Sequence, residues 1–305
     1  MFDDYCHKNV SLKTPAECGP ECQWIHDDIS NFLYFYGNGH MNNFTSAATN
    51  RPPWANYSRS IYSIKIEDGL ESIGDYCFNA FGNLTVFELG NTIKMTGIYC
   101  FQGDPKLTYV TLPDSLVNMQ MYCFSNCGAI KTMHFGKNLV YIGIVALDGT
   151  HSLEQITCHP ENPIITVVDG VLFNKEMTDI IQFPARDPRV EYTIPDGITV
   201  IKDSAFEAVA FLKTINIPST VKIIEVYAFY VTKVLEVLTI PTSAQDIRAH
   251  AFCGSPNFVS IIWKGTEPPK SCAKEGDKQI NQTTVSVPMN YTGDIWCGYP
   301  VKKIL

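Results

Sequence analysis

The sequence predicts an α/β solenoid, in which 23-residue units stack on one another and pair short parallel strands. Two columns of residues recur at this spacing over residues 60–263, with one interruption. The first column joins a small residue to a large apolar one: Cys77-Phe78, Cys100-Phe101, Cys123-Phe124, Ala146-Leu147, Ala205-Phe206, Ala228-Phe229 and Ala251-Phe252. The second column is apolar throughout: Leu89, Leu112, Phe135, Cys158, Ile194, Ile217, Ile240 and Trp263. Two columns in register predict that each unit buries its apolar face against its neighbours.

Each unit is expected to contain one short strand and a turn that leads back to the next strand. The segment Leu212–Pro218 alternates apolar and polar residues and closes on proline, as a strand does. The chain then returns through Ser219–Phe229 in short turns or helices. Prolines recur at the same strand end because they lack an N–H for the ladder: Pro113, Pro195, Pro218 and Pro241.

The interruption is expected to form a β-hairpin that projects from the stack. Leu147 and Phe206 are separated by 59 positions instead of 23. Asp169-Gly170 is a strong turn signal between apolar runs that alternate like strands. An insertion of this kind lies on one face of a solenoid and is often used in binding, although a simple spacer is the alternative.

Composition excludes several classes of protein. The 305 residues carry a net charge of −8 without long runs of either sign, which argues against nucleic-acid binding. No apolar stretch approaches the ~20 residues of a membrane-spanning helix, so membrane insertion is not expected. The first residues, Met1 to Leu12, lack the apolar core of a signal peptide.

Asparagine sequons and cap cysteines favour an extracellular protein. Six N-x-S/T acceptors are present: Asn9, Asn43, Asn56, Asn83, Asn281 and Asn290. The ends of a solenoid lack one neighbour and need covalent support. We therefore expect one disulfide among Cys6, Cys18 and Cys22, and another between Cys272 and Cys297. A zinc site formed by Cys6, His7, Cys18, Cys22 and His26 is a weaker alternative, since its spacing fits no usual zinc motif.

The remaining cysteines are expected to be structural. Cys77, Cys100 and Cys123 share a column with alanines, which favours small buried thiols, and Cys158 is expected to be buried in the strand column. Cys127 and Cys253 have no evident partner. Neither a metal site nor a cofactor is expected.

The repeat pattern resembles the BspA-type leucine-rich repeat family of bacteria and anaerobic protists. It stands here as Leu107-Thr-Tyr-Val-Thr-Leu-Pro113 and Ile201-Lys-Asp-Ser-Ala-Phe206. Segments outside the repeats also look like family features, at Cys22-Gln-Trp24, Pro53-Trp54 and Trp263–Pro269. The resemblance implies a leucine-rich repeat solenoid with a concave parallel sheet, a β-rich N-terminal cap and a hairpin insertion. The expected division is cap 1–60, repeats 61–158, hairpin insertion 159–190, repeats 191–263 and C-terminal cap 264–305.

In such a solenoid the side chains between the buried strand positions form the concave face, and these are the candidate ligand-binding residues. Four strands each contribute two of these residues: Ser63 and Lys65, Val86 and Glu88, Val237 and Thr239, and Ser260 and Ile262. Its other members are mostly small and polar: Tyr109, Thr111, Thr132, His134, Gln155, Thr157, Thr214 and Asn216. Only Tyr109 and His134 have the size of binding anchors. A solvated sheet surface without a ligand is the alternative.

The sequence contains no catalytic constellation. It lacks a G-x-S-x-G elbow, a phosphate-binding loop and an H-E-x-x-H motif, and its histidines are scattered. The resemblance implies a non-enzymatic adhesin-like protein, at the cell surface or secreted, that binds host, matrix or cell-surface glycoproteins. The alternative is a structural subunit that self-associates or decorates a larger assembly, with a cytoplasmic location. Carbohydrate binding on the concave face is a third possibility.

Overall fold

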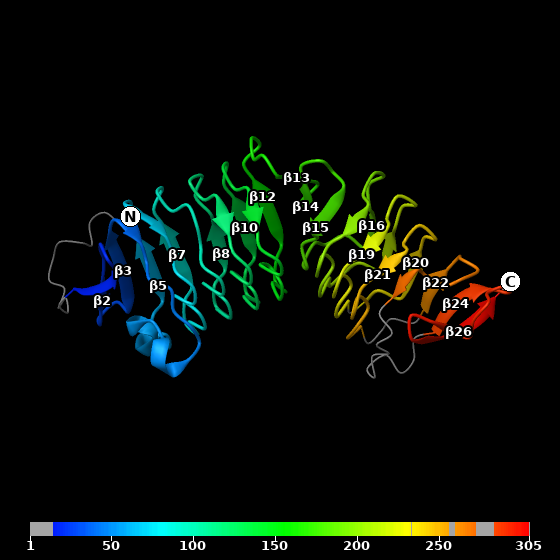
Figure 1. Cartoon of the computed structure of the whole chain (residues 1–305), viewed down its shortest axis with the longest axis horizontal. Helices are drawn as coiled ribbons and strands as arrows, with labels where there is room; N and C mark the ends of the chain where they lie inside the picture. Colours follow the sequence, from blue (N-terminus) through cyan, green and yellow to red (C-terminus); the bar gives the residue numbers. More distant parts are fainter. Residues whose placement is uncertain (1–14, 233, 256–259, 273–283, 305) are drawn as a thin grey trace. The chain divides into compact units, whose positions relative to one another are not determined.

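The chain forms two compact units, which Figure 1 shows as successive stacks of strands. The computed structural model describes residues 15–232, 234–255, 260–272 and 284–304. Unit 1 comprises the described residues up to Thr150 together with 158–163, and unit 2 comprises residues 151–157 and the described residues from Ile164 onward. Each unit is a β-solenoid of stacked turns, as the 23-residue period predicts.

Unit 1 contains two sets of strands. Along one side, β1, β2, β3, β5 and β7 form a sheet in that order, and β8 pairs in parallel with β10. A second ladder of very short parallel strands runs behind it through β4, β6, β9 and β11, with Met95 bridging β6 to β9. The elements are β1 (Ala16–Gly19), β2 (Cys22–Asp27), β3 (Phe32–Gly37), β4 (Gly39–His40), η1 (Ala48–Asn50), η2 (Pro53–Tyr57), β5 (Ser63–Ile66), β6 (Leu70–Ser72), β7 (Val86–Leu89), β8 (Tyr109–Thr111), β9 (Asn118–Met119), β10 (Thr132–Phe135) and β11 (Tyr141–Ile142).

Unit 2 repeats this arrangement with two longer ladders. One sheet has the order β16-β18-β20-β22-β24-β26-β25, and the other has the order β13-β14-β15-β17-β19-β21-β23. The elements are β12 (Gln155–Cys158), β13 (Ile165–Val168), β14 (Val171–Asn174), β15 (Asp179–Gln182), β16 (Glu191–Thr193), β17 (Val200–Ile201), β18 (Thr214–Asn216), β19 (Ile223–Ile224), β20 (Val237–Ile240), β21 (Asp246–Ile247), β22 (Ser260–Trp263), β23 (Ser271–Cys272), β24 (Thr284–Pro288), β25 (Ile295–Trp296) and β26 (Tyr299–Ile304).

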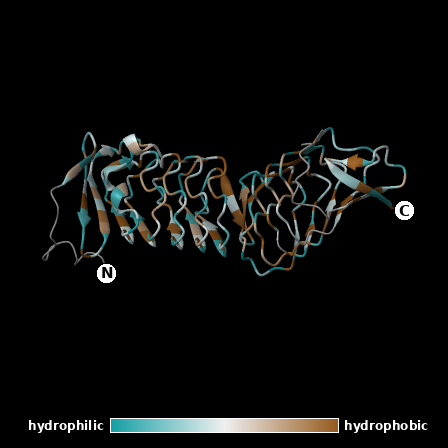
Figure 2. Cartoon of the chain, turned by 90° about the horizontal axis from the view of Figure 1, so that it is seen from below, coloured by the Kyte–Doolittle hydropathy of each residue, from teal (hydrophilic) through white to brown (hydrophobic). Residues whose placement is uncertain are grey.

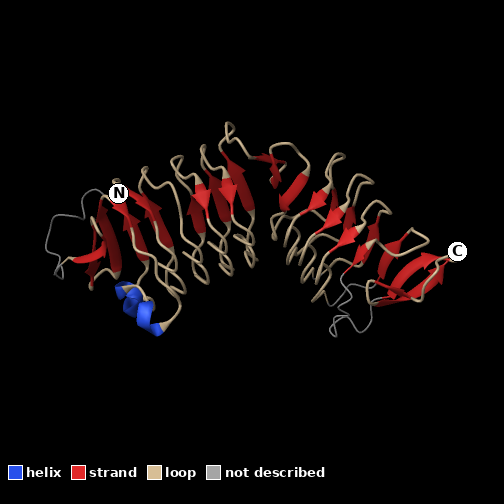
Figure 3. Cartoon of the chain, viewed as in Figure 1, coloured by secondary structure: helices blue, strands red, loops and turns tan. Residues whose placement is uncertain are grey.

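The connections between strands are turns. In the described residues, helix is confined to the 3-10 turns η1 and η2 of unit 1 (Figure 3). Every turn uses a non-glycine residue in the left-handed region immediately before the small column residue, for example Tyr99 (φ 57°) and Tyr227 (φ 57°). This conformation is uncommon for residues with a side chain, so it is a fixed requirement of the turn.

The core of each unit contains a row of stacked aromatic rings, which we call the ring file. Phe101 lies 5.3 Å from both Phe78 and Phe124, measured between ring centroids, and all three are fully buried. In unit 2, Phe206 lies 5.3 Å from Phe229 in the same way. Figure 2 shows apolar and polar segments alternating along the turns, as expected where each turn buries one row of side chains.

The expected hairpin forms around Asp169-Gly170, but it does not project, because the insertion belongs to the unit 2 stack. β13, β14 and β15 form an antiparallel meander, and β15 then pairs in parallel with β17. Phe183, which follows β15, takes a place in the ring file 5.4 Å from Phe206. Its side chain and those of Val171–Phe173 are fully buried, because pairing β15 with β17 draws the meander into the core.

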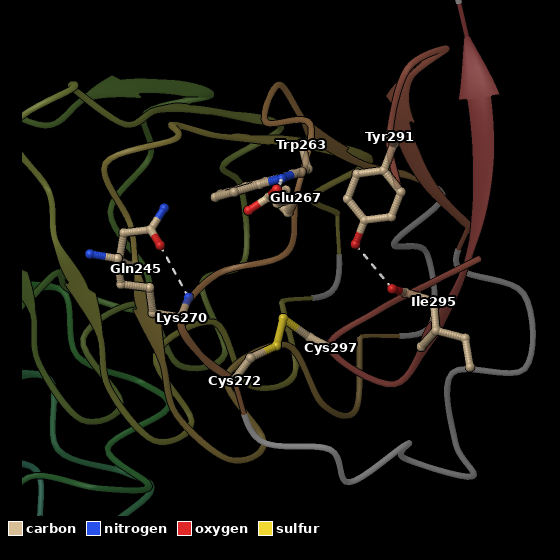
Figure 4. Close-up of a disulfide and its surroundings, with 8 residues drawn as sticks. All are labelled: Gln245, Trp263, Glu267, Lys270, Cys272, Tyr291, Ile295 and Cys297. Atoms are coloured by element: carbon tan, nitrogen blue, oxygen red, sulfur yellow. Dashed lines mark hydrogen bonds between the residues drawn. A yellow bond between two sulfur atoms is a disulfide. The ribbon is translucent and has the colours of Figure 1, made fainter. Parts of the chain in front are cut away.

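Aromatic residues and disulfides close the two ends of the fold. Trp54 of η2 is buried against Phe35, and its Nε1 donates to the carbonyl of Cys77 at 2.6 Å. A disulfide joins Cys18 to Cys22 in the β1–β2 hairpin. In unit 2 a disulfide joins Cys272 to Cys297 beneath Trp263 (Figure 4). Around it, Trp263 Nε1 donates to the Glu267 carbonyl at 2.8 Å and the Tyr291 hydroxyl to the Ile295 carbonyl at 3.0 Å.

Candidate interaction surface

The outward side chains of the strands form a continuous face in each unit, which we call the strand face. In unit 1 it includes Lys65, Glu88, Tyr109, Thr111, Thr132 and His134, all of them candidates from sequence. Lys65 lies beside Glu88 across β5 and β7, with 3.4 Å between Nζ and Oε1. Tyr109 and Thr132 pair across β8 and β10, as do Thr111 and His134. The intervening residues of these strands are buried, which fixes the others outward.

Two unit 1 side chains on this face are large, apolar and exposed. Tyr109 is 61% exposed and Val86 is 43% exposed. His134, the second expected anchor, is half-buried. Exposed aromatic residues are the side chains that most often contribute strongly to binding between proteins. Tyr109 is therefore the strongest single anchor on the predicted face.

The strand face of unit 2 is smaller in side-chain volume and richer in hydrogen bonds. Thr214 and Asn216 on β18 are exposed, and Thr239 on β20 is half-buried. The Asn216 amide donates to Glu191 Oε1 at 3.0 Å and to Thr193 Oγ1 at 3.1 Å. Gln155 and Thr157 of β12 are exposed as well. This face offers polar groups that are already paired with each other.

The N-terminal cap carries an aromatic strip that is not among the candidates from sequence. Phe32, Tyr34 and Tyr36 occupy alternate positions of β3 and are half-buried, while Leu33 and Phe35 between them are fully buried. Neighbouring ring centroids lie 6.2 and 5.6 Å apart. The alternation is present in the sequence, but this segment lies outside the 23-residue repeat, so the period does not reveal it. β3 continues the sheet of the repeats, because it pairs in parallel with β5.

A shallow hollow of about 270 Å³ adjoins this strip at the ends of β5 and β7. Three carboxylates line it, from Glu67, Asp68 and Glu88, together with the ammonium group of Lys65. Asp68 Oδ1 accepts the Asn91 N–H at 2.6 Å, which holds the loop after β7 in place. Among the described residues that line the hollow, Lys65 carries the only basic side chain.

The cysteines outside the caps are free, and most are buried. Cys77, Cys100, Cys123, Cys127 and Cys253 are inaccessible, whereas Cys158 is half-buried, contrary to the expectation for the strand column. Desolvation raises the pKa of the Cys77, Cys100 and Cys127 thiols. Protonated, buried thiols are poor nucleophiles.

Two of the cysteines proposed for the alternative zinc site are not free to bind a metal ion. Cys18 and Cys22 are bonded to each other, and Cys6 and His7 lie outside the described residues. Within the described part of the chain, no group of three His, Cys, Asp or Glu residues is placed to hold a metal ion. The described ranges also contain no helix with the length and apolarity needed to cross a bilayer.

Three of the six sequons present an exposed asparagine, at Asn43, Asn56 and Asn290. Asn83 differs, because its amide donates to the Arg59 carbonyl and its Oδ1 accepts from Lys106 Nζ at 2.6 Å. Asn9 and Asn281 lie outside the described residues. Glycan attachment needs a free amide nitrogen, so the three exposed sites fit the modification better than Asn83.

The chain matches a family described as BspA type leucine rich repeat region, in six copies over residues 54–175 and 188–272. No curated protein matches it. A leucine-rich repeat protein from Eubacterium ventriosum has a similar structure, with a TM-score of 0.74, 20% identity, and coverage of 95% of this chain and 84% of that one.

Two further structures share the fold at low identity. The pneumococcal vaccine antigen PcpA gives a TM-score of 0.62 at 16% identity, covering 98% of this chain and 100% of that one. A leucine rich cell surface protein from Faecalibacterium prausnitzii gives 0.53 at 17% identity, covering 92% and 90%. At these identities the similarity establishes the fold alone.

Proposed function

Since the chain belongs to the BspA-type leucine-rich repeat family, we propose that it is a non-enzymatic binding module that recognises a protein or glycoprotein through its strand face. One observation carries the proposal. Tyr109 stands 61% exposed on β8, the edge strand that pairs in parallel with β10, and the next residue, Val110, is buried on the opposite face. A rigid sheet presents such an anchor with little loss of conformational entropy on binding.

An extracellular or cell-surface location accompanies this proposal. The exposed sequons at Asn43, Asn56 and Asn290 and the disulfides in both caps are typical of proteins in an oxidising compartment. Two proteins of the same fold are described as a vaccine antigen and a cell surface protein. The alternative of a self-associating structural subunit uses the same surfaces for contacts between copies of the chain.

The test is binding of the purified full chain to a panel of immobilised matrix and cell-surface glycoproteins. Tyr109→Ala should weaken binding by about 30-fold, as the loss of a central anchor does. Ile144→Ala is the matched control, because Ile144 is 60% exposed but is not on a strand. Equal weakening by both variants would contradict the use of the strand face. Concentration-dependent self-association without binding to the panel would favour the structural subunit.

A further inference from the structure

The N-terminal cap of unit 1 carries a surface that combines aromatic area with negative charge. We define the cap surface as Ile25, Phe32, Tyr34 and Tyr36 together with the hollow lined by Lys65, Glu67, Asp68 and Glu88. Strand register places its two halves on the same face. Tyr34 pairs with Ile25 on β2 and with Lys65 on β5, and Lys65 pairs with Glu88 on β7.

The aromatic half of the cap surface is apolar and held in place. Tyr36 donates its hydroxyl hydrogen to Gln23 Oε1 at 2.7 Å, which fixes the end of the strip. The planes of adjacent rings are inclined by 30° and 28°, so the three rings form one ordered row along β3. The aliphatic stem of an arginine or lysine side chain can pack along such a row while its charged head stays in water.

The charged half of the cap surface is strongly acidic. Glu67, Asp68 and Glu88 line the hollow, and Lys65 neutralises one of them through its contact with Glu88 at 3.4 Å. Outside the hollow, at the other end of the strip, Asp27 on β2 adds a carboxylate beside Phe32. These carboxylates repel phosphate and other anions and attract cations over the range of a Debye length.

We propose that the cap surface binds a cationic segment of a partner protein, one that carries arginine or lysine side chains on an extended backbone. The aliphatic stems of these side chains lie along the tyrosine rings, and their charged heads reach the carboxylates of the hollow. The charge complementarity of the hollow identifies the partner. The inference rests on the proposed function, since it names the chemistry of one partner segment.

The probe is a fluorescein-labelled peptide of six arginines, with a peptide of six glutamates for comparison. Fluorescence anisotropy with the full chain should show saturable binding of the arginine peptide alone. Binding should weaken as salt is raised, because exposed charges are screened. The double variant Glu67→Gln/Glu88→Gln should reduce the affinity by about 10-fold or more, since two of the attracting charges are lost.

A matched control separates a site from the general negative charge of the chain. Glu176→Gln/Glu236→Gln removes the same charge from exposed positions of unit 2 and should change the affinity less than about 2-fold. Tyr36→Ala should weaken binding about 5-fold without changing the net charge. Equal weakening by both double variants, or equal binding of the glutamate peptide, would overturn the proposal. Loss of panel binding on Tyr109→Ala with no arginine-peptide binding would remove this inference alone.

Discussion

Units 1 and 2 build the same turn from different residues. Three positions before the small column residue, unit 1 carries glycine in three of four turns, and unit 2 carries a charged residue in all three. The unit 1 residues are Gly74, Gly97, Gln120 and Gly143. The unit 2 residues are Lys202, Glu225 and Arg248. A single fold thus tolerates either the smallest or the longest side chains at one position.

The glycines of unit 1 allow adjacent turns to approach closely. A Cβ added to Gly97 would lie 2.3 Å from the carbonyl carbon of Gly74, and one added to Gly143 would lie 2.2 Å from the Met121 nitrogen. Such distances are well inside van der Waals contact. Next to these glycines, Tyr99 stacks on Tyr122 with ring centroids 4.5 Å apart. Unit 1 therefore packs its turns by backbone contact and ring stacking.

Unit 2 joins its turns by charge. Glu225 is buried and accepts from Lys202 Nζ and from Arg248 Nη1, each at 3.0 Å, which ties three successive turns together. Burial raises the pKa of neighbouring Asp203, and the Glu225 carboxylate adds to the effect. The left-handed residue and the ring file, which both units share, therefore define the turn, and the surface of the turn is free to vary.

The largest expected loss of stability is the same in both units, because each unit contains a ring file. Phe101→Ala and Phe206→Ala should each lower the free energy of unfolding by about 3–5 kcal/mol, since both remove a fully buried ring between two neighbours. Urea denaturation followed by circular dichroism measures the change. Phe211→Ala is the control, because that ring is 45% exposed and should cost less than about 1 kcal/mol. A large difference between Phe101→Ala and Phe206→Ala would show that the files are not equivalent.

Gly97→Ala should break the packing that is special to unit 1. The added methyl group meets the Gly74 backbone, which cannot move aside as a flexible side chain would, so we expect a loss of about 1–3 kcal/mol. Gly82→Ala is the control, since a Cβ there would have nothing within 4 Å. Thermal unfolding of both variants gives the comparison. If the two behaved alike, close backbone approach would not explain the glycines.

Glu225→Gln should weaken the charge ladder that is special to unit 2. The change removes the charge shared by Lys202 and Arg248, and we expect a loss of about 1–2 kcal/mol, because both cations are partly exposed and regain water. The loss should shrink in high salt. Glu71→Gln in unit 1 is the matched control, since the Glu71–Lys94 pair is exposed and should contribute less than about 0.5 kcal/mol.

The 23-residue spacing was sufficient to predict the solenoid, because each column residue must be buried for the turns to stack. The same spacing predicted where the parallel strands lie and that prolines follow them. The place of Phe183 in the aromatic column was not predicted, although Phe183 lies 23 positions before Phe206. The residue before it, Gln182, stands where other turns have Cys or Ala. The hairpin at Asp169-Gly170 is present, but it does not project, because the insertion supplies a turn of its own to the stack.

The site was less predictable than the fold. Inward and outward positions follow from alternation, and candidates such as Tyr109 and Thr132 do alternate with buried residues on their strands, while their role in binding stays a prediction. Burial of each outward residue depends on its neighbours, and the sequence could not reveal that His134 is half-buried while Tyr109 is exposed. The second ladder was missed because strands of two or three residues, such as β9 and β19, carry too short a pattern.

Asp104 provides the smallest and most specific test of unit 1. Its side chain is fully buried, where the corresponding position of unit 2 holds Thr232 or Ser255. Oδ1 accepts the Phe81 N–H at 2.7 Å, whereas Oδ2 has no hydrogen-bond partner among the described residues. Burial raises the pKa of this carboxyl well above its usual range. The folded state therefore holds a proton that the unfolded chain releases above its ordinary pKa, so the stability of unit 1 falls as pH rises toward the folded pKa.

Asp104→Asn should remove this pH dependence, because the amide keeps the acceptor for Phe81 and never ionises. We expect a gain of about 1 kcal/mol at pH 8 and a smaller change at pH 4, where the carboxyl of the unfolded chain also holds much of its proton and the two states differ little in bound protons. Asp114→Asn is the control, since Asp114 accepts the Lys137 N–H in the same way at 2.8 Å but is exposed. Urea titrations at both pH values measure the difference. A gain that is equal at pH 4 and pH 8 would mean that the amide side chain packs better than the carboxyl for reasons unrelated to charge, and the buried carboxyl would then not distinguish the two units.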